Sequence, residues 1–237
     1  MRYENVVSGN FIKRPNRFVA EVMIDGEPVT VHVKNTGRCR ELLRAGAVVY
    51  LEDFRGRMGS RKMRYSLIAV DKPSDNGIMT VNMDSQAPNK AVLEALRDER
   101  FRPEGMGRLK VIRPETVFGG SRFDFYLEDE EGRKAFMEVK GVTLEYGGHA
   151  SFPDAPTERG TRHLRELILA REEGYEAYIL FVIQMKPMKD ICPNEEHDPE
   201  FAKALREAAA KGVRVMALDC KVTPGSMILD EPVKVIL

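Results

Sequence analysis

The chain contains no apolar run that approaches the roughly 20 residues needed to span a membrane, and its N-terminal segment lacks the apolar core of a signal peptide. Its three cysteines, Cys39, Cys192 and Cys220, are far apart and show neither disulfide nor zinc-ligand spacing. No glycine-rich phosphate loop follows a predicted strand, which argues against a nucleotide-binding enzyme. We therefore expect a cytoplasmic globular protein with reduced cysteines and no membrane contact.

Charge is balanced over the whole chain but unevenly distributed along it. Of the 237 residues, 43% are hydrophobic and 31% are charged, as expected of a globular protein with one large or two small domains. Residues 1–70 contain 13 Lys and Arg against 7 Asp and Glu, a net charge of +6, and the remainder carries −6. A basic first segment favours a polyanionic partner such as nucleic acid.

Short alternating apolar segments predict a small β-barrel in residues 1–83. The strand predicted at 18–24 leads into Asp25-Gly26, which is a strong hairpin signal. Further strands are predicted at 29–33, 47–54 and 64–70, and a short helix at 38–45. Several short strands with one small helix are typical of an OB-like barrel.

Such barrels bind nucleic acid through a basic groove and aromatic rings. Contacts of this kind go to the phosphate backbone, so we expect DNA binding with little sequence specificity. For each basic residue the alternative is a solvated surface position. The candidate DNA contacts in this segment are Lys13, Arg14, Arg17, Lys34, Arg38, Arg61, Lys62 and Arg64, with Tyr65 as a stacking ring.

Residues 84–237 alternate between predicted helices and strands. A helix opened by Pro88 is followed by two strand-like segments on either side of Pro114 and then by a hairpin. The remaining elements are a helix ending at Gly174, a strand at 177–184, a helix at 199–211 and a strand at 213–218. This rhythm predicts parallel pairing and an α/β domain with a mixed central sheet.

Asp124, Glu138 and Lys140 lie on the predicted hairpin. The segments SRFDFYLE and KAFMEVK have strand character, and a three-residue loop ending in glycine places Asp124 opposite Glu138. Side chains alternate along a strand, so Glu138 and Lys140 share one face. Opposed carboxylates repel unless a cation lies between them, and oxygen ligands suit Mg²⁺ or Mn²⁺. Lys140 would then hold or deprotonate an attacking water, or steady developing charge. The alternative is an ordinary solvent-facing hairpin.

The element order after residue 87, with an acidic residue on the second strand and an ExK motif on the third, resembles the core of the PD-(D/E)xK nuclease superfamily. Within it, the segments NTGRCRELLRAG, SRFDF, EVKGVTL and FPDAPTERGTRHLREL are similar to the sugar fermentation stimulation protein A (SfsA) family, nearly end to end. One departure is Phe123, which stands before Asp124 in place of the motif's proline; that proline is often absent in the superfamily. The resemblance implies an OB-type DNA-binding domain at 1–83 and a nuclease-like α/β domain at 84–237.

The resemblance also assigns roles to single residues. Asp124 and Glu138 match the metal-binding acidic pair, and Lys140 matches the motif lysine. An acidic residue on the first core helix implies Glu94 as a further metal ligand, with a solvated helix charge as the alternative. On the helix after the site, the residues that would contact phosphates are Arg159, Arg162 and His163. For His163, the alternatives are a general acid and a structural hydrogen-bonding residue.

Together these observations predict a Mg²⁺- or Mn²⁺-dependent deoxyribonuclease in which Asp124, Glu138 and Lys140 hydrolyse phosphodiester bonds. The alternative is a non-catalytic DNA-binding regulator of sugar-metabolism genes, in which the same carboxylates turn over slowly or not at all. The family name describes an effect on sugar metabolism and no molecular activity, so the sequence leaves both functions open, as it does the oligomeric state.

Overall fold

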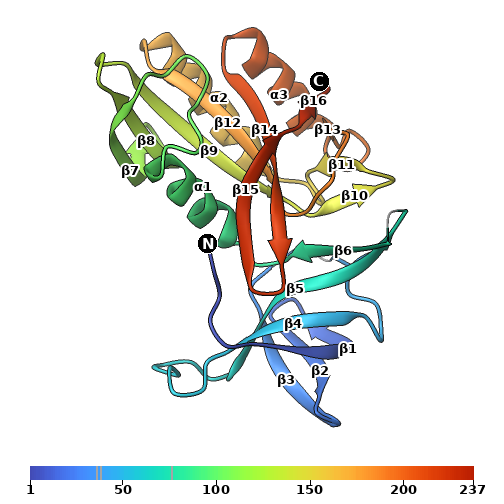
Figure 1. Ribbon diagram of the computed structural model, residues 1–237. Coiled ribbons are helices and arrows are strands. Elements are labelled where there is room, and N and C mark those ends of the chain that lie inside the picture. Colours follow the sequence, from blue (N-terminus) through green and yellow to red (C-terminus); the bar gives the residue numbers. More distant parts are fainter. Residues whose placement is uncertain (36, 38, 76) are drawn as a thin grey trace.

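The computed structural model of the protein describes residues 1–35, 37, 39–75 and 77–237. The chain forms two lobes, a β-barrel made by the first third of the sequence and an α/β domain made by the rest (Figure 1). In the parts of the chain that the structure describes, no helix is long and apolar enough to cross a membrane.

A six-stranded sheet forms the barrel. Its order is β3-β2-β1-β4-β5-β6, and a parallel pairing between β3 and β5 closes the sheet on itself. Asp25 and Gly26 both have positive φ (51° and 85°), as the predicted two-residue hairpin turn requires. The predicted OB-like barrel is therefore confirmed. Its strands are β1 (Val6–Asn16), β2 (Val19–Ile24), β3 (Glu27–Val33), β4 (Val48–Asp53), β5 (Tyr65–Ser74) and β6 (Gly77–Asn82).

The helix predicted at residues 38–45 is wrong for the residues described there. The amides of Leu42 and Leu43 both donate to the carbonyl of Cys39, which closes a single turn. Beyond that turn the chain pairs with β1, since the amide of Gly46 donates to Phe11 and the amide of Phe11 donates to Ala47. Because the chain pairs with β1 from Gly46 onward, the segment before it is too short for a helix.

A mixed six-stranded sheet forms the centre of the α/β lobe, as predicted. Its order is β15-β14-β12-β9-β8-β7, in which β9, β12 and β14 are mutually parallel and the outer pairings are antiparallel. The strands are β7 (Leu109–Phe118), β8 (Ser121–Asp129), β9 (Lys134–Val142), β12 (Glu176–Ile183), β14 (Arg214–Thr223) and β15 (Ser226–Pro232).

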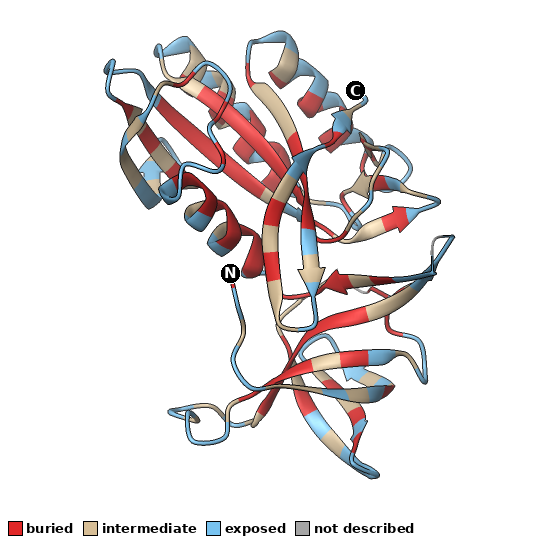
Figure 2. Cartoon of the chain, in the orientation of Figure 1, coloured by how far each residue is buried: buried red, intermediate tan, exposed pale blue. Residues whose placement is uncertain are grey.

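Helices cover both faces of this sheet. Helix α1 (Ala87–Arg97) lies on one face, and helices α2 (Glu158–Glu172) and α3 (Pro199–Ala210) lie on the other (Figure 1). The central strands β9 and β12 are buried along most of their length (Figure 2), which matches the continuous apolar run of β12. Helix α2 begins where the hydroxyl of Thr157 accepts a hydrogen bond from the amide of Gly160 at 3.0 Å.

Strand β7 corrects the prediction of two separate segments around Pro114. The strand runs without interruption through this residue, because β7 is the edge of the sheet and pairs only with β8. At an edge, the missing amide of proline faces no partner strand. The adjoining Glu115 has a φ of 55°, which marks a local distortion of the strand.

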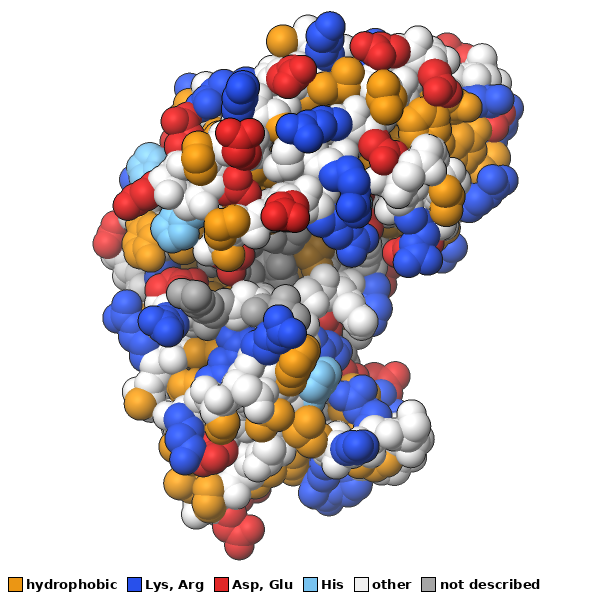
Figure 3. Space-filling view, turned by 180° about the vertical axis from the view of Figure 1, so that it is seen from behind, with side chains coloured by type: hydrophobic (Ala, Val, Ile, Leu, Met, Phe, Trp, Pro, Cys, Tyr) orange, Lys and Arg blue, Asp and Glu red, His pale blue; other side chains and the backbone are white. Residues whose placement is uncertain are grey.

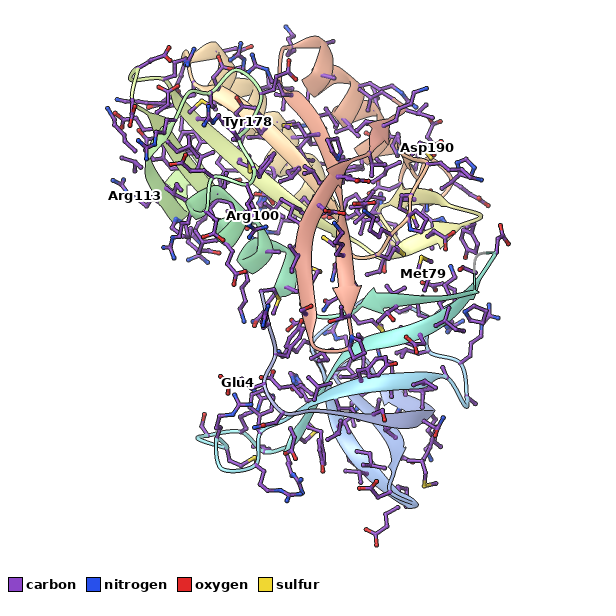
Figure 4. All side chains as sticks on the ribbon, viewed as in Figure 1. Glu4, Met79, Arg100, Arg113, Tyr178 and Asp190 are labelled. Carbon is purple, nitrogen blue, oxygen red and sulfur yellow. The ribbon has the colours of Figure 1, made fainter. Side chains whose placement is uncertain are left out.

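The two lobes are held together by several contacts. A small sheet lies beside the barrel, and Met79 of β6 is buried between the two (Figure 4). The ammonium of Lys72 and the carboxylate of Glu145 form an ion pair of 2.5 Å across this junction. At the other side, the first residues pack on the α/β lobe, since the amide of Tyr3 donates to Gly225. The small sheet consists of β10 (Leu144–Tyr146), β11 (His149–Phe152), β13 (Asp190–Pro193) and β16 (Lys234–Val235).

Candidate active site

The β8–β9 hairpin positions the two acidic residues that the sequence singled out. Phe125 pairs with Met137, and continuing this register by one residue sets Asp124 opposite Glu138. The turn is held by Asp129, whose buried carboxylate accepts hydrogen bonds from the amides of residues 107, 131 and 133 at 2.8, 3.1 and 2.8 Å. Burial would raise the pKa of Asp129, but these donors and the Arg133 guanidinium lower it to about 2.

Asp124 is held by two donors. Its Oδ1 accepts a hydrogen bond from the Asn89 amide on α1, and its Oδ2 accepts one from the backbone amide of Val139, both at 2.7 Å. Burial, together with the charge of Glu138, nevertheless raises the pKa of Asp124 to about 6. Two like charges at this buried place repel each other, so the pair is unfavourable when both carboxylates are charged.

Glu138 is almost completely buried, with 4% of its surface exposed. Its Oε1 accepts hydrogen bonds from the Lys140 ammonium at 2.7 Å and from Nδ1 of His163 at 2.5 Å. Burial would raise the pKa of Glu138, but the His163 hydrogen bond and the Lys140 charge outweigh it and keep the pKa below its usual value. The second oxygen, Oε2, is buried and has no hydrogen-bond partner among the residues described.

His163 does not contact solvent, which corrects its prediction as a DNA contact. The ring is 2% exposed, and its Nε2 accepts a hydrogen bond of 3.4 Å from Nε of Arg159. Because an Arg nitrogen can only donate, the ring proton is assigned to Nδ1, which donates to Glu138. His163 thus has the structural hydrogen-bonding role that was its alternative. Arg159 and Arg162 are exposed on the same helix, as a phosphate contact requires.

Glu94 lies apart from the acidic pair, which corrects its prediction as a metal ligand. Its carboxylate forms an ion pair of 2.6 Å with the N-terminal ammonium of Met1 and is half-exposed. The α1 residue that reaches Asp124 is Asn89, and five positions of helix turn Glu94 roughly 140° away from it. Within the described ranges, no three His, Cys, Asp or Glu side chains come together as a metal site.

Several barrel residues predicted to contact DNA are engaged within the protein instead. Lys34 forms an ion pair of 2.7 Å with the fully buried Asp84. Arg64 donates two hydrogen bonds to Asp53, at 2.7 and 2.5 Å, and covers the buried ring of Tyr65, which is therefore no stacking ring. These intramolecular ion pairs correct the prediction for Lys34 and Arg64.

The other predicted barrel contacts differ in exposure. Arg14 donates to the carbonyls of Arg17, Asn35 and Gly37, so it fixes the backbone around it. Arg61 lies over the Phe54 ring at 3.6 Å and donates to Ser66. Lys13 pairs with Glu21 at 3.4 Å. Arg17 and Lys62 are exposed, and Arg38 lies outside the described residues.

The arrangement around Glu138 suits a small divalent cation. The buried Oε2 of Glu138, which has no donor in the described part of the chain, lies beside a second carboxylate whose charge is unfavourable there. Carboxylate oxygens are the ligands that Mg²⁺, Mn²⁺ and Ca²⁺ prefer. Sequence reasoning missed Asn89, because it reaches the site through a contact between two elements. It also missed the role of Asp129 in holding the turn, although the spacing of Asp129 from Gly132 indicated a turn there.

Two family models match the chain, one in each lobe. The model described as the SfsA N-terminal OB domain matches residues 12–80, and the model described as the sugar fermentation stimulation protein RE domain matches residues 86–226.

Full-length relatives agree with these matches. A sugar fermentation stimulation protein homolog of Desulfitobacterium hafniense strain Y51 is 50% identical over 227 residues, covering 96% of this chain and 94% of its own. The homolog of Clostridium acetobutylicum is 46% identical over 238 residues and covers both chains completely. The solved structure of Pyrococcus furiosus SfsA in complex with Ca²⁺ is 29% identical, with a TM-score of 0.86 over 100% of this chain and 98% of that one. The chain therefore belongs to the sugar fermentation stimulation protein (SfsA) family.

Proposed function

We propose that this protein is a cytoplasmic DNA-binding protein that hydrolyses phosphodiester bonds at a metal-dependent site formed by Asp124, Glu138 and Lys140. The observation that carries the proposal is the buried Oε2 of Glu138, which has no donor among the described residues and lies beside a second carboxylate. Such an oxygen is costly to bury unless a cation binds it. The Ca²⁺ complex of the Pyrococcus furiosus relative supports a divalent ion in this family.

Each residue of the site has a separate task in this proposal. Asp124 and Glu138 would hold Mg²⁺ or Mn²⁺, which when bound supplies positive charge to the phosphate oxygens. Lys140, whose ammonium is 2.7 Å from Oε1 of Glu138, orients the attacking water and balances the charge that develops on the phosphate. Asn89 and the amide of Val139 orient the carboxylate of Asp124, and His163 fixes Oε1 of Glu138, which leaves Oε2 of Glu138 for the cation.

In this proposal the two lobes have different roles, one in DNA binding and the other in hydrolysis. The barrel at 1–83 binds the DNA backbone with little sequence specificity, and the domain at 84–237 carries the hydrolytic site. On the face shown in Figure 3, Lys and Arg side chains of both lobes border the hollow between them. A surface of this charge favours a polyanion that spans both lobes.

The test is single-turnover cleavage of labelled DNA across a titration of Mg²⁺ or Mn²⁺. Replacing Asp124 by Asn removes an anionic ligand, so cleavage falls by at least about 100-fold and partly recovers at high metal concentration. Replacing Lys140 by Ala leaves the carboxylates in place, so cleavage falls similarly and more metal does not restore it. Glu94→Gln is the matched control and cleaves like the wild type.

A non-catalytic regulator is the second candidate, because the relatives carry a name that refers to sugar fermentation. It predicts DNA binding with no metal-dependent cleavage above the background of an Asp124→Asn/Lys140→Ala double variant. Equal trace cleavage in the wild type and this double variant would contradict the hydrolytic function.

A further inference from the structure

A basic groove runs along the barrel and contains some of the basic residues that the sequence suggested as DNA contacts. The groove has a volume of about 480 Å³, and none of the described residues that line it is acidic. Its walls are β1 with the following turn, and the segment between β3 and β4. Arg14 joins the two walls, because its guanidinium donates to carbonyls on both. The basic residues lining the groove are Lys13, Arg14, Arg17 and Arg40.

Lys13 of this groove pairs with Glu21, but two other basic residues of the groove have charges that no ion pair with a described residue neutralises. Arg17 and Arg40 are exposed, and neither forms an ion pair with any described residue. In the loop, by contrast, Arg57 pairs with Glu4 and Glu52, and Arg64 pairs with Asp53. A phosphate chain therefore meets uncompensated positive charge in the groove.

The groove adjoins a second groove at Gly37, which lines both. The second groove lies between the lobes and has a volume of about 180 Å³. That second groove is lined by Gly141, which follows Lys140 in β9, and by Asp154, which precedes α2. The second groove therefore includes residues of β9, the strand that carries Glu138 and Lys140.

An exposed aromatic ring lies beside the groove. Phe18 follows Arg17 at the β1–β2 turn, is 48% exposed, and has the Arg17 guanidinium 4.9 Å from its ring centre. Exposed rings beside basic grooves stack with unpaired bases, which a duplex keeps inside its own stack.

From these observations we infer that the groove of Lys13, Arg17 and Arg40, with Phe18 at its side, binds the backbone of single-stranded DNA. The inference rests on the proposed function for its choice of DNA as the partner. It places the binding surface of the barrel on this groove and away from the loop at 54–64.

The test compares two double charge reversals that change the net charge equally. Arg17→Glu/Arg40→Glu alters the groove, and Arg55→Glu/Lys62→Glu alters exposed positions of the loop. Binding of a labelled single-stranded oligonucleotide is measured by fluorescence anisotropy with EDTA, which prevents cleavage, from 50 to 300 mM salt. Because both residues would contact phosphates, the groove variant binds at least about tenfold more weakly and its salt slope falls by about 1.4. The loop variant stays within about threefold of the wild type.

The outcomes separate this inference from the proposed function. Equal weakening of both variants, or stronger weakening of the loop variant, would overturn the groove while leaving DNA as the partner. No salt-dependent binding by the wild type would remove the DNA-binding function itself. Circular dichroism of both variants confirms that folding is unchanged.

The ring is tested separately by Phe18→Ala, with Ile78→Ala as the control because Ile78 is also an exposed apolar residue of a barrel hairpin. Loss of one stacked base weakens binding of the single strand by about 5- to 150-fold, and leaves binding of the duplex of the same sequence unchanged. Equal effects on the single strand and the duplex, or no effect on either, would contradict the stacking role.

Discussion

Replacing His163 by Leu removes one of the two donors to the buried carboxylate of Glu138. The hydrogen bond is 2.5 Å long and His163 is 2% exposed, so solvent does not substitute for the lost donor. Hydrogen bonds to charged groups contribute about 1.5–3 kcal/mol, and we expect the free energy of unfolding to fall by this amount. For a chain of this length, that corresponds to a decrease of about 3–12 °C in Tm.

His163→Asn is the conservative variant, because its side-chain amide places a donor near the position of Nδ1. It should recover most of the hydrogen-bond energy, apart from the edge-on contact between His163 and the Phe123 ring. His149→Leu is the matched control, since His149 pairs with Asp190 at an exposed position and should lose less than about 1 kcal/mol.

Urea denaturation of the metal-free variants measures these differences. Titration with Mn²⁺ then tests whether His163 positions Glu138: His163→Leu should bind Mn²⁺ more weakly, and His163→Asn should restore binding. A His163→Leu variant with the stability and Mn²⁺ affinity of the wild type would refute the reasoning.

Two further predictions concern stability. Asp129→Asn destabilises the protein at pH 7, because the pKa of Asp129 is lowered to about 2 in the folded protein. The stability that the charged carboxylate contributes is fully present when the pH is above the ordinary pKa near 3.8, and it is lost as the pH falls toward 2. The denaturation curves of wild type and variant should therefore converge near pH 2. Lys34→Met leaves Asp84 buried without its ion-pair partner, which should cost about 3–5 kcal/mol in urea denaturation while the salt slope of DNA binding stays unchanged. If Lys34→Met were as stable as the wild type, the ion pair with Asp84 would not account for Lys34, and Lys34 would again be a candidate DNA contact.

The hairpin could be predicted from the sequence because its determinants are local. A loop centred on Glu131 fixes the register, and a period of two then decides which side chains share a face with Glu138. The same local logic placed the turn at Asp25-Gly26 and the start of α3 after Asp198. Where residues close in the sequence determine the local structure, the sequence pattern was sufficient to predict it.

The predictions that were wrong share one cause, which is that they depended on contacts between residues far apart in the sequence. Lys34 and Arg64 resemble free surface cations until Asp84 and Asp53 are brought beside them by folding. The spacing of α1 defines its faces, but only its packing on the sheet decides that Asn89, five positions before Glu94, meets the site. Helix phase and ion pairing of this kind depend on tertiary contacts that no short sequence window contains.

Calorimetric titration of the metal-free protein with Mn²⁺, in the absence of DNA, tests the central claim most directly. The account predicts one site in the wild type, binding weakened by at least about 100-fold in Glu138→Gln because an anionic ligand oxygen is lost, and wild-type binding in Glu94→Gln. Equal Mn²⁺ affinity in the wild type and Glu138→Gln would contradict it.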